Sequence, residues 1–301
     1  MASNGADRLD LKITNAAVKE MAEAFAVFAP YRSIPKLTMF GSARTRPDDP
    51  LYDQAWELAT GLSRAGWMLV TGAGPGIMAA GLEGAGPDKA FGINIRLPFE
   101  DAPNAFISGD PKLVEMKYFF TRKLMLLKES DGYAVLPGGF GTMDEAFELL
   151  TLLQTGKAEP SPLVFVDVPG GTYWRAWERF VADELGARGL ISSEDTTLYR
   201  ITDDVAQAAA EVLDFYRHYH SLRLVGDLSV IRLRTAPSDE KLAALNLEFG
   251  DICARGDIHR TEALPEARAG RDNVELPRIA LHFDRTHYGR LRQLIDALNE
   301  D

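Results

Sequence analysis

The stretch Tyr133–Glu145, YAVLPGGFGTMDE, decides the fold. A hydrophobic run leads into three glycines within four positions, and an apolar periodic segment over 146–153 follows. This pattern predicts a strand, a glycine turn and a helix, in that order. Glycines lack Cβ atoms, so a ligand can approach the backbone closely. The helix that follows would direct unpaired N–H groups and its positive dipole end at the same place, which suits a phosphate group.

An acid pair, Asp144 and Glu145, stands just inside this predicted helix. A dinucleotide fingerprint or a P-loop carries neither acid at that place. A second interpretation needs no ligand, because Thr142-x-x-Glu145 fits a capping box in which the threonine caps the helix and the glutamate bonds back. Such a cap contributes about 1 kcal/mol. On this stretch alone both interpretations stand.

The rest of the first 220 residues repeats the same order of elements. Apolar strands are predicted at 37–40, 67–70, 90–95 and 163–166, with a short strand at 197–201, and helices at 14–29, 51–65, 111–128, 172–185 and 203–219. Fully apolar strands that alternate with helices indicate a parallel sheet covered on both faces, a Rossmann-like doubly wound α/β fold.

Two further glycine turns, Gly41-Ser42 and Gly72–Met78, follow predicted strands. The carboxyl ends of parallel strands lie at one edge of a sheet, where open α/β folds bind ligands. Together with the first turn they predict a nucleotide-sized site. The spacing Gly72-x-Gly74-x-Gly76 is not that of a dinucleotide fingerprint, which argues against NAD.

Three local expectations are less central. Residues 1–9 are expected to be disordered, and Thr14 to cap the first helix. The predicted helix 111–128 carries an apolar stripe that would pack on the sheet, made of Leu113, Met116, Phe119, Phe120, Leu124 and Leu127.

Residues 221–301 have a different character. Strand, helix, strand or loop, strand and helix are predicted in turn, which suggests a small α+β domain of ferredoxin-like or ACT-like type. The chain is therefore expected to consist of domains 1–220 and 221–301, the second serving in oligomerisation or binding a small effector. His218-x-His220 is placed on a helix, where residues two apart do not face each other.

Composition excludes several classes of function. The net charge of −11 disfavours nucleic acid and anionic membranes as partners. No apolar run approaches the ~20 residues of a membrane span, and the first residues lack a signal core, so a cytoplasmic location is expected. All five histidines follow residue 217, and Cys253 is the single cysteine. Histidine-dependent nucleophiles and the usual zinc sites are thus excluded from the glycine-rich region, and no metal is expected there.

The motif P-G-G-x-G-T-x-x-E over Pro137–Glu145, taken with Arg122-Lys123 upstream, resembles the LOG family. These proteins were long labelled "lysine decarboxylase-like" and include cytokinin riboside 5′-monophosphate phosphoribohydrolases and bacterial nucleotide 5′-monophosphate nucleosidases. The turn Gly72–Met78 fits the family pattern loosely, with Ala73 in place of a glycine, and Gly41-Ser42 fits the first-strand turn. The resemblance covers about residues 35–215 and none of 221–301.

The resemblance implies an enzyme that cleaves the N-glycosidic bond of a purine or cytokinin nucleoside 5′-monophosphate, giving free base and ribose 5-phosphate. Arg122 and Glu145 would be catalytic, and no cofactor would be needed. The substrate-binding residues it implies are Gly41, Ser42, Gly74, Gly76, Met78, Lys123, Pro137, Gly138, Gly139, Gly141, Thr142 and Asp144. Among them Gly138, Gly139, Gly141 and Thr142 would cradle the phosphate, and Asp144 would help to hold the ribose. Relatives place the active site at a dimer contact, so at least a homodimer is expected.

The chemistry of these residue types agrees with that reaction. Cleavage passes through an oxocarbenium-like ribosyl cation, which a carboxylate can stabilise while it orients the attacking water. An arginine can hold that carboxylate or the phosphate in a two-pronged fork.

Two other functions stay open. The same pocket could sense a nucleotide without turnover and signal through 221–301. The older label would mean a pyridoxal-phosphate decarboxylase, which holds its cofactor on a lysine. Nothing around Lys117, Lys123 or Lys128 resembles such a site.

Overall fold

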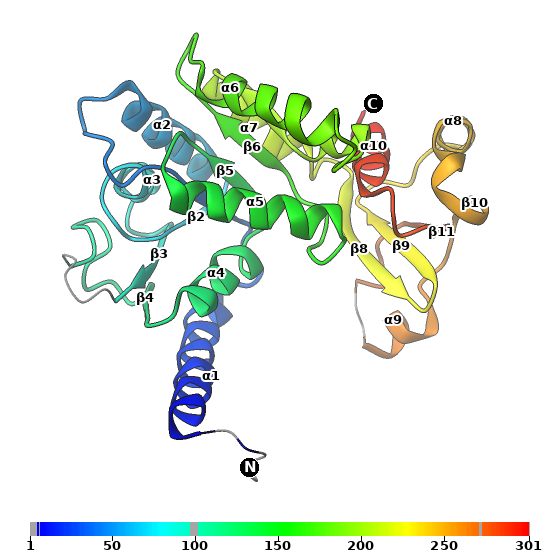
Figure 1. Cartoon of the computed structure of the whole chain (residues 1–301). Helices are drawn as coiled ribbons and strands as arrows, with labels where there is room; N and C mark the ends of the chain where they lie inside the picture. Colours follow the sequence, from blue (N-terminus) through cyan, green and yellow to red (C-terminus); the bar gives the residue numbers. More distant parts are fainter. Residues whose placement is uncertain (1–4, 6, 97–101, 271–272, 301) are drawn as a thin grey trace. The chain divides into compact units, whose positions relative to one another are not determined.

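The computed structural model of the chain describes residues 5, 7–96, 102–270 and 273–300. It contains two sheets (Figure 1). The larger has seven strands in the order β4-β3-β2-β1-β5-β6-β7, and the smaller has four in the order β10-β11-β9-β8. By contacts the chain divides into two compact units, one of residues 1–146, 165–174 and 201–209, the other of 147–164, 175–200 and 210–301.

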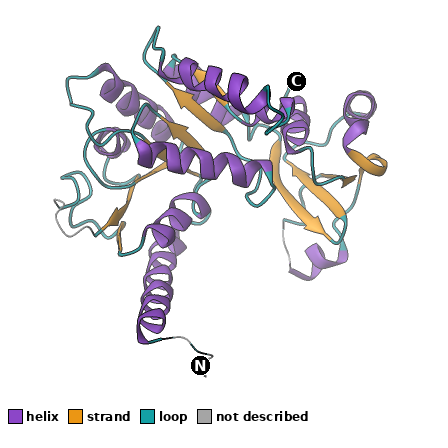
Figure 2. Cartoon of the chain, in the orientation of Figure 1, coloured by secondary structure: helices purple, strands orange, loops and turns teal. Residues whose placement is uncertain are grey.

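The first sheet is that of a Rossmann-like α/β fold. Strand β1 pairs in parallel with β2 and β5, β2 with β3, and β3 with β4. Helices run beside the strands (Figure 2). The strands are β1 (Lys36–Phe40), β2 (Met68–Thr71), β3 (Ala90–Ile95), β4 (Leu113–Met116), β5 (Gly132–Val135), β6 (Leu163–Val166) and β7 (Arg200–Thr202). The helices are α1 (Arg8–Phe28), α2 (Pro50–Arg64), α3 (Ile77–Ala85), α4 (Phe119–Lys128), α5 (Phe140–Gln154), α6 (Tyr173–Phe180) and α7 (Val205–Asp214).

Residue polarity explains why these strands are central. Every residue of β1, β2, β5 and β6 is buried, as expected for parallel strands covered on both faces. From β1 the chain adds β2, β3 and β4 on one side and later β5, β6 and β7 on the other. The winding therefore reverses between β1 and β5. The glycine turns after these two strands lie at the switch point, where open sheets of this kind bind ligands.

The first helix begins earlier than predicted. It starts at Arg8, and the Asp7 carboxylate accepts the N–H groups of Leu9 and Asp10. Thr14 lies inside the helix and donates to the Asp10 carbonyl, so its prediction as the cap is wrong. An aspartate with an acid three residues on is as good a capping signal as a threonine, and it lies about two turns upstream. Of the residues expected to be disordered, 1–4 and 6 lie outside the described residues.

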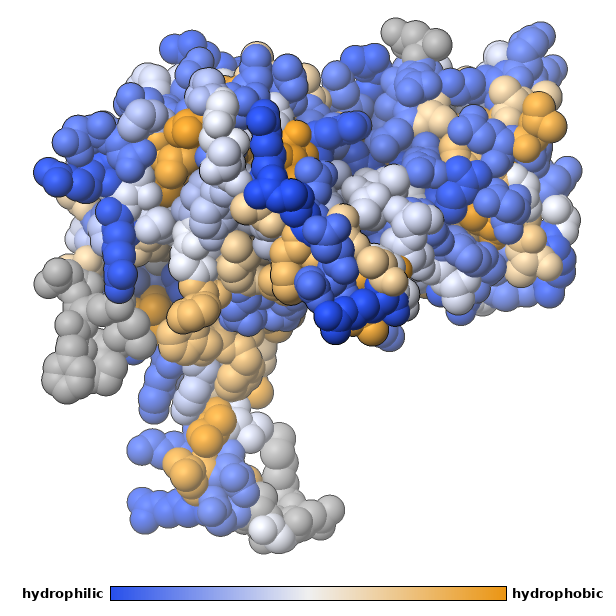
Figure 3. Space-filling model, turned by 45° about the horizontal axis from the view of Figure 1, so that its top comes forward, coloured by the Kyte–Doolittle hydropathy of each residue, from blue (hydrophilic) through white to orange (hydrophobic). Residues whose placement is uncertain are grey.

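The single helix predicted over 111–128 is wrong. Residues 113–116 form strand β4 beside β3, and only 119–128 form helix α4. The apolar spacing was misleading because it joined two elements. Three members of the predicted stripe, Phe119, Phe120 and Leu124, are 60%, 58% and 45% exposed. In the space-filling view, apolar residues gather on the surface near the N-terminal helix (Figure 3).

The second sheet is wholly antiparallel in its paired strands. Its elements are β8 (Tyr219–Val225), β9 (Leu228–Leu233), α8 (Asp239–Phe249), β10 (Cys253–Arg260), α9 (Pro265–Gly270), β11 (Arg278–Phe283) and α10 (Tyr288–Asn299). Ile231, Ile279 and Leu281 of the sheet pack with Leu291 and Ile295 of α10 in one core. The predicted strand, helix, strand, strand and helix are all present, but strand β8 before them and helix α9 between β10 and β11 were not predicted.

That missed strand corrects the reading of the histidine pair. Helix α7 ends at Asp214, so the helix predicted to continue to 219 is too long. His218 lies in a bend and His220 in β8. The short strand predicted at 197–201 is also shifted: residues 193–198 form a 3-10 helix, η3 (Ser193–Leu198), and β7 follows it. The helix predicted over 172–185 is α6 followed by a π-helical turn over Val181–Gly186.

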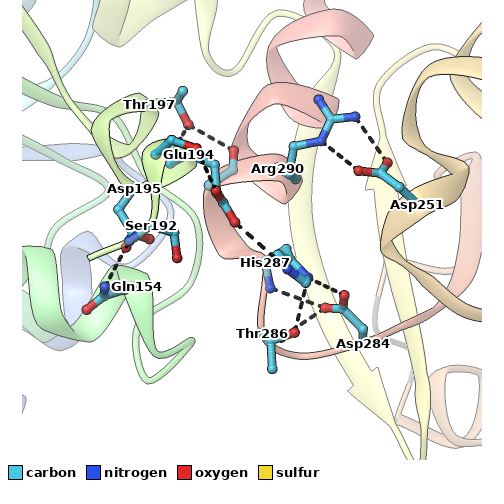
Figure 4. Close-up of polar contacts among 12 residues, drawn as sticks. Gln154, Ser192, Glu194, Asp195, Thr197, Asp251, Asp284, Thr286, His287 and Arg290 are labelled. Atoms are coloured by element: carbon cyan, nitrogen blue, oxygen red, sulfur yellow. Dashed lines mark hydrogen bonds and ion pairs between the residues drawn. The ribbon is translucent and has the colours of Figure 1, made fainter. Parts of the chain in front are cut away.

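A polar cluster joins α10 to η3 within the second unit (Figure 4). The His287 ring lies between two carboxylates, with Nδ1 2.5 Å from Asp284 Oδ2 and Nε2 3.9 Å from Glu194 Oε1. The hydrogen bond that the His287 ring donates to the Asp284 carboxylate is the main reason why the pKa of His287 is raised. The Thr197 hydroxyl donates to the Gly289 carbonyl at 2.9 Å, and a Cβ on Gly289 would lie 2.0 Å from the Glu194 carbonyl oxygen. This joint therefore requires glycine at 289.

Among the described residues, no helix is long and apolar enough to cross a membrane. The same part of the chain holds no group of three or more His, Cys, Asp or Glu side chains placed to bind a metal ion.

Candidate functional site

A pocket of about 1090 Å³ lies at the carboxyl edge of the first sheet. The turns after β1, β2 and β5 form its floor, and α4 and α5 contribute side chains. The residues that line it are Met39, Phe40, Gly41, Ser42, Ala43, Arg44, Gly72, Ala73, Gly74, Pro75, Met78, Asn94, Ile95, Ala102, Phe119, Arg122, Leu126, Gly138, Gly139, Phe140, Gly141, Thr142, Met143, Asp144, Glu145 and Tyr173. Most of the predicted site residues are therefore brought to one cavity.

The turn after β5 opens helix α5 directly. The helix begins at Phe140, and its first backbone bond runs from the Met143 N–H to the Gly139 carbonyl at 3.1 Å. Thr142 thus stands within the first turn, where a residue cannot act as the N-cap, so the capping-box interpretation of Thr142 and Glu145 is wrong. The N–H groups of the first turn, from Phe140 to Thr142, have no helical acceptor and lie along the pocket wall.

Arg122 reaches the pocket from α4. Its Nε donates to the Ile93 carbonyl at 2.9 Å and its Nη2 to the Gly72 carbonyl at 3.1 Å. A Cβ on Gly72 would lie 2.0 Å from Nη2, so glycine there makes room for the guanidinium. Two carbonyls at strand ends therefore fix the arginine at the sheet edge. Glu145 from α5 lines the same cavity and is half-buried, with Oε2 buried.

Two predicted binding residues pair with each other. Lys123 Nζ lies 2.7 Å from Asp144 Oδ2, and the lysine side chain is only 15% exposed. Asp144 lines the pocket, whereas Lys123 does not. The lysine is thus placed to hold the Asp144 carboxylate rather than to contact a ligand in this arrangement.

The three glycine turns are bonded to one another. The Ser42 N–H donates to the Pro137 carbonyl at 3.1 Å, and the Ile77 N–H donates to the Ser42 carbonyl at 3.0 Å. Gly76 has φ +66°, and a Cβ there would lie 2.2 Å from the Ser42 carbonyl oxygen. Pro137 and Gly76 do not line the pocket, so they shape its floor instead.

Ala73 stands where the family pattern has a glycine, and its backbone conformation is one that favours glycine. Ala73 has φ +61°, a left-handed conformation in which an L residue is strained by about 1–2 kcal/mol. Asn104 compensates at this turn, because its Nδ2 donates to the carbonyls of Ala73 at 3.0 Å and Gly74 at 2.8 Å. Met78 lies against the turn, since a Cβ on Gly74 would be 2.6 Å from Met78 Cε.

Sequence reasoning missed Tyr173, Asn94 and Asn104. Tyr173 lines the pocket, and its hydroxyl donates to the Gly138 carbonyl at 2.5 Å. A usable signal existed, because Tyr173 follows Gly170-Gly171 shortly after the buried strand β6 and so lies at the same sheet edge as the other turns. Asn104 could not have been found, since its segment carries no pattern that points to a site.

Fold and site together define a Rossmann-like α/β domain that resembles the LOG family. Residues 76–212 match the family described as "Possible lysine decarboxylase", which is the older label of that family, so the match confirms the resemblance. The chain is 30% identical over 99 residues to the "Probable cytokinin riboside 5′-monophosphate phosphoribohydrolase LOGL3" of rice, Oryza sativa subsp. japonica. That alignment covers 33% of this chain and 44% of the rice protein.

A second relative is aligned over more of its length. The "Cytokinin riboside 5′-monophosphate phosphoribohydrolase" of Mycobacterium tuberculosis is 28% identical over 164 residues, which is 52% of this chain and 83% of that protein. Among solved structures, the molybdenum cofactor carrier protein of Chlamydomonas reinhardtii aligns with a TM-score of 0.41 and 21% identity, over 60% of this chain and 96% of its own. At that similarity the structural match says nothing about ligand or activity.

Proposed function

We propose that this protein is a phosphoribohydrolase that cleaves the N-glycosidic bond of a purine or cytokinin nucleoside 5′-monophosphate, releasing the base and ribose 5-phosphate. One observation carries the proposal: Glu145 and Arg122, from two different helices, line a single pocket together with the phosphate-type turn at Gly138–Thr142. The two relatives named as phosphoribohydrolases support the same reaction.

Each group has a role that its position allows. The 5′-phosphate binds the N–H groups of the Gly138–Thr142 turn at the positive end of α5. That contact anchors the ribose, and its binding energy holds C1′ in the orientation needed for reaction. The Glu145 carboxylate faces the cationic sugar that develops as the bond breaks, and it orients and deprotonates the attacking water. Arg122 adds positive charge at the sheet edge, where it binds an anionic oxygen of the substrate or steadies the carboxylate.

The lining of the pocket argues against the decarboxylase label. A pyridoxal-phosphate enzyme needs a lysine that faces the cofactor. None of the described residues that line the pocket is a lysine, and the neighbouring Lys123 is engaged by Asp144. A Schiff-base site therefore has no amine to use in this cavity. A colourless purified protein without aldimine absorbance is the expected result.

The experiment that tests the proposal is a panel of AMP, GMP, CMP, UMP and a cytokinin ribotide, with release of free base as the measurement. Wild type should release base from at least one nucleotide. Glu145→Gln should lose turnover by at least about a hundredfold while it keeps most of its nucleotide affinity, because the amide preserves shape and removes the charge. Glu57→Gln, an exposed change on α2, is the matched control and should leave turnover unchanged.

The outcomes separate the two functions. Base release by wild type that Glu145→Gln does not reduce would contradict the assigned role of Glu145. Binding of nucleotides with no base release from any of them would instead favour a sensing module that signals through residues 221–301.

We also propose that the protein acts at least as a homodimer. Helix α4 exposes Phe119, Phe120 and Leu124, of which Phe119 lines the pocket, and Phe140 at the start of α5 is 97% exposed. Apolar surface of this kind next to a site marks an interface. Phe119 and Phe140 also line the cavity, so a second copy that covers them would close one side of it.

A further inference from the structure

The loop that follows β6 is built around one buried carboxylate. Asp167 accepts the Val168 N–H with Oδ1 and the Tyr173 N–H with Oδ2, both at 2.9 Å. A Cβ on Gly171 would lie 2.3 Å from that carboxylate, so the loop needs glycine to close over it. Asp203 accepts the Gly170 N–H at 2.9 Å and fixes the outer side of the loop. The start of α6 is thereby held firmly in place.

This loop sets the position of the Tyr173 ring. The Trp174 indole donates to the Val166 carbonyl at 3.1 Å, and the Tyr173 ring meets the Trp174 ring edge-on with centroids 4.8 Å apart. The tyrosine hydroxyl then reaches the Gly138 carbonyl at 2.5 Å. Tyr173 lines the pocket, and its hydroxyl is bonded to the protein backbone.

Because the peptide bond is planar and trans, the contact of Tyr173 with the Gly138 carbonyl also fixes the orientation of the next N–H group. The carbonyl of one residue and the N–H of the next point in opposite directions. Tyr173 holds the Gly138 carbonyl, so the Gly139 N–H must point the opposite way. The Ser42 N–H holds the Pro137 carbonyl at 3.1 Å in the same manner and so orients the Gly138 N–H. Both carbonyls of the turn are thus tied to protein donors, which leaves two adjacent N–H groups oriented as donors beside those of the α5 N-terminus.

We propose that Tyr173 is a positioning residue for the phosphate site: through its hydrogen bond to the Gly138 carbonyl it orients the Gly139 N–H toward a bound phosphate. The inference rests on the proposed function for the identity of the ligand, a phosphorylated ribose. Tyr173 itself does not bond the phosphate. Its loss therefore weakens binding of the phosphorylated sugar and leaves contacts to the base intact.

The test is titration calorimetry with ribose 5-phosphate on wild type and Tyr173→Phe, which removes only the hydroxyl. One net hydrogen bond corresponds to a loss of affinity of about three- to tenfold. Tyr52→Phe is the matched control, because the Tyr52 hydroxyl makes a single bond of 2.7 Å to Glu83 in the same unit and does not line the pocket. It should bind ribose 5-phosphate like wild type. A nucleoside without phosphate should lose little affinity in Tyr173→Phe.

Three results would overturn the inference. In the first, Tyr173→Phe binds ribose 5-phosphate as tightly as wild type does. In the second, Tyr173→Phe loses as much affinity for the nucleoside as for ribose 5-phosphate. In the third, wild type does not bind ribose 5-phosphate. Failure of the hydrolase proposal would look different: wild type would bind ribose 5-phosphate, Tyr173→Phe would weaken that binding, and no nucleotide would yield free base.

Discussion

Glu20 offers a sharp prediction about how α4, the helix that carries Arg122, is held. Glu20 lies on α1 and is only 8% exposed. Its carboxylate accepts the Lys117 N–H at 2.9 Å and a short hydrogen bond from the Thr121 hydroxyl. Tyr118, the N-cap of α4, makes no side-chain cap bond. The buried glutamate of one helix therefore holds the chain that leads into another, and its negative charge is favourable near that helix's N-terminus.

The expected cost of Glu20→Ala follows from these contacts. The hydroxyl of Thr121 keeps a second acceptor, the Tyr118 carbonyl at 2.8 Å, so the charged bond to the Lys117 N–H is the main loss. Loss of a charge-assisted bond at this buried site leaves the Lys117 N–H unpaired and lowers the free energy of unfolding by about 2 kcal/mol. Glu20→Gln keeps an acceptor and should cost about half as much.

The assay is urea denaturation followed by circular dichroism. The matched control is Glu23→Ala on the same helix, where the side chain is exposed and pairs only with Lys19 at 3.8 Å, so its effect should stay within about 0.5 kcal/mol. Because Arg122 directly follows Thr121, turnover of Glu20→Ala should also fall several-fold. Equal stability of Glu20→Ala and Glu23→Ala would refute the reasoning.

Three further predictions concern the glycine turn at Gly76, the His287 cluster and the exposed apolar residues of α4. Gly76→Ala combines left-handed backbone strain with a steric clash, so it should lower the free energy of unfolding by about 3 kcal/mol. Gly170→Ala should lower it by only about 1 kcal/mol, because φ is +74° there but nothing lies within 4 Å of the added Cβ. His287 has a raised pKa, so its contribution to stability is complete below its ordinary value of 6.5 and disappears as the pH rises through the raised value. The melting temperatures of wild type and His287→Gln should therefore differ more near pH 6 than near pH 9, and a constant difference would contradict this. Phe120→Asp should lower the molar mass measured by light scattering to that of the monomer, whereas Leu247→Asp, at a 91% exposed position on α8, should not. A wild type that is monomeric at micromolar concentrations would contradict the proposed dimer.

Local patterns predicted most of the first sheet because burial leaves little freedom there. Strand β6 carries the residues predicted for it, and β1, β2, β3 and β5 lie within one residue of the predicted bounds. A fully apolar run flanked by helices can be satisfied only inside a parallel sheet. Errors gathered at the edge, where β4 was mistaken for part of α4. An edge strand is short and mixed in polarity, so its pattern resembles that of a helix.

The candidate site was only partly accessible from sequence. Glycine turns after strands are local signals, and they pointed to Gly41, Gly72 and Gly138 without knowledge of the fold. The partners of Arg122 were not accessible, since Ile93 in β3 and Gly72 after β2 are 29 and 50 residues away. The same holds for the pairing of Lys123 with Asp144, 21 residues apart.

By itself the sequence determined the α/β class, the edge of the sheet that forms the pocket and the residue types available for chemistry. Each of these follows from composition and short-range periodicity. Tertiary structure alone decided that Thr142 lies inside helix α5, that Glu20 of α1 bonds Lys117 and Thr121 at the start of α4, and that Tyr173 bonds Gly138. The physical reason is that hydrogen-bond partners across a sheet edge are chosen by three-dimensional packing, which joins residues whose separation in the chain carries no local signal.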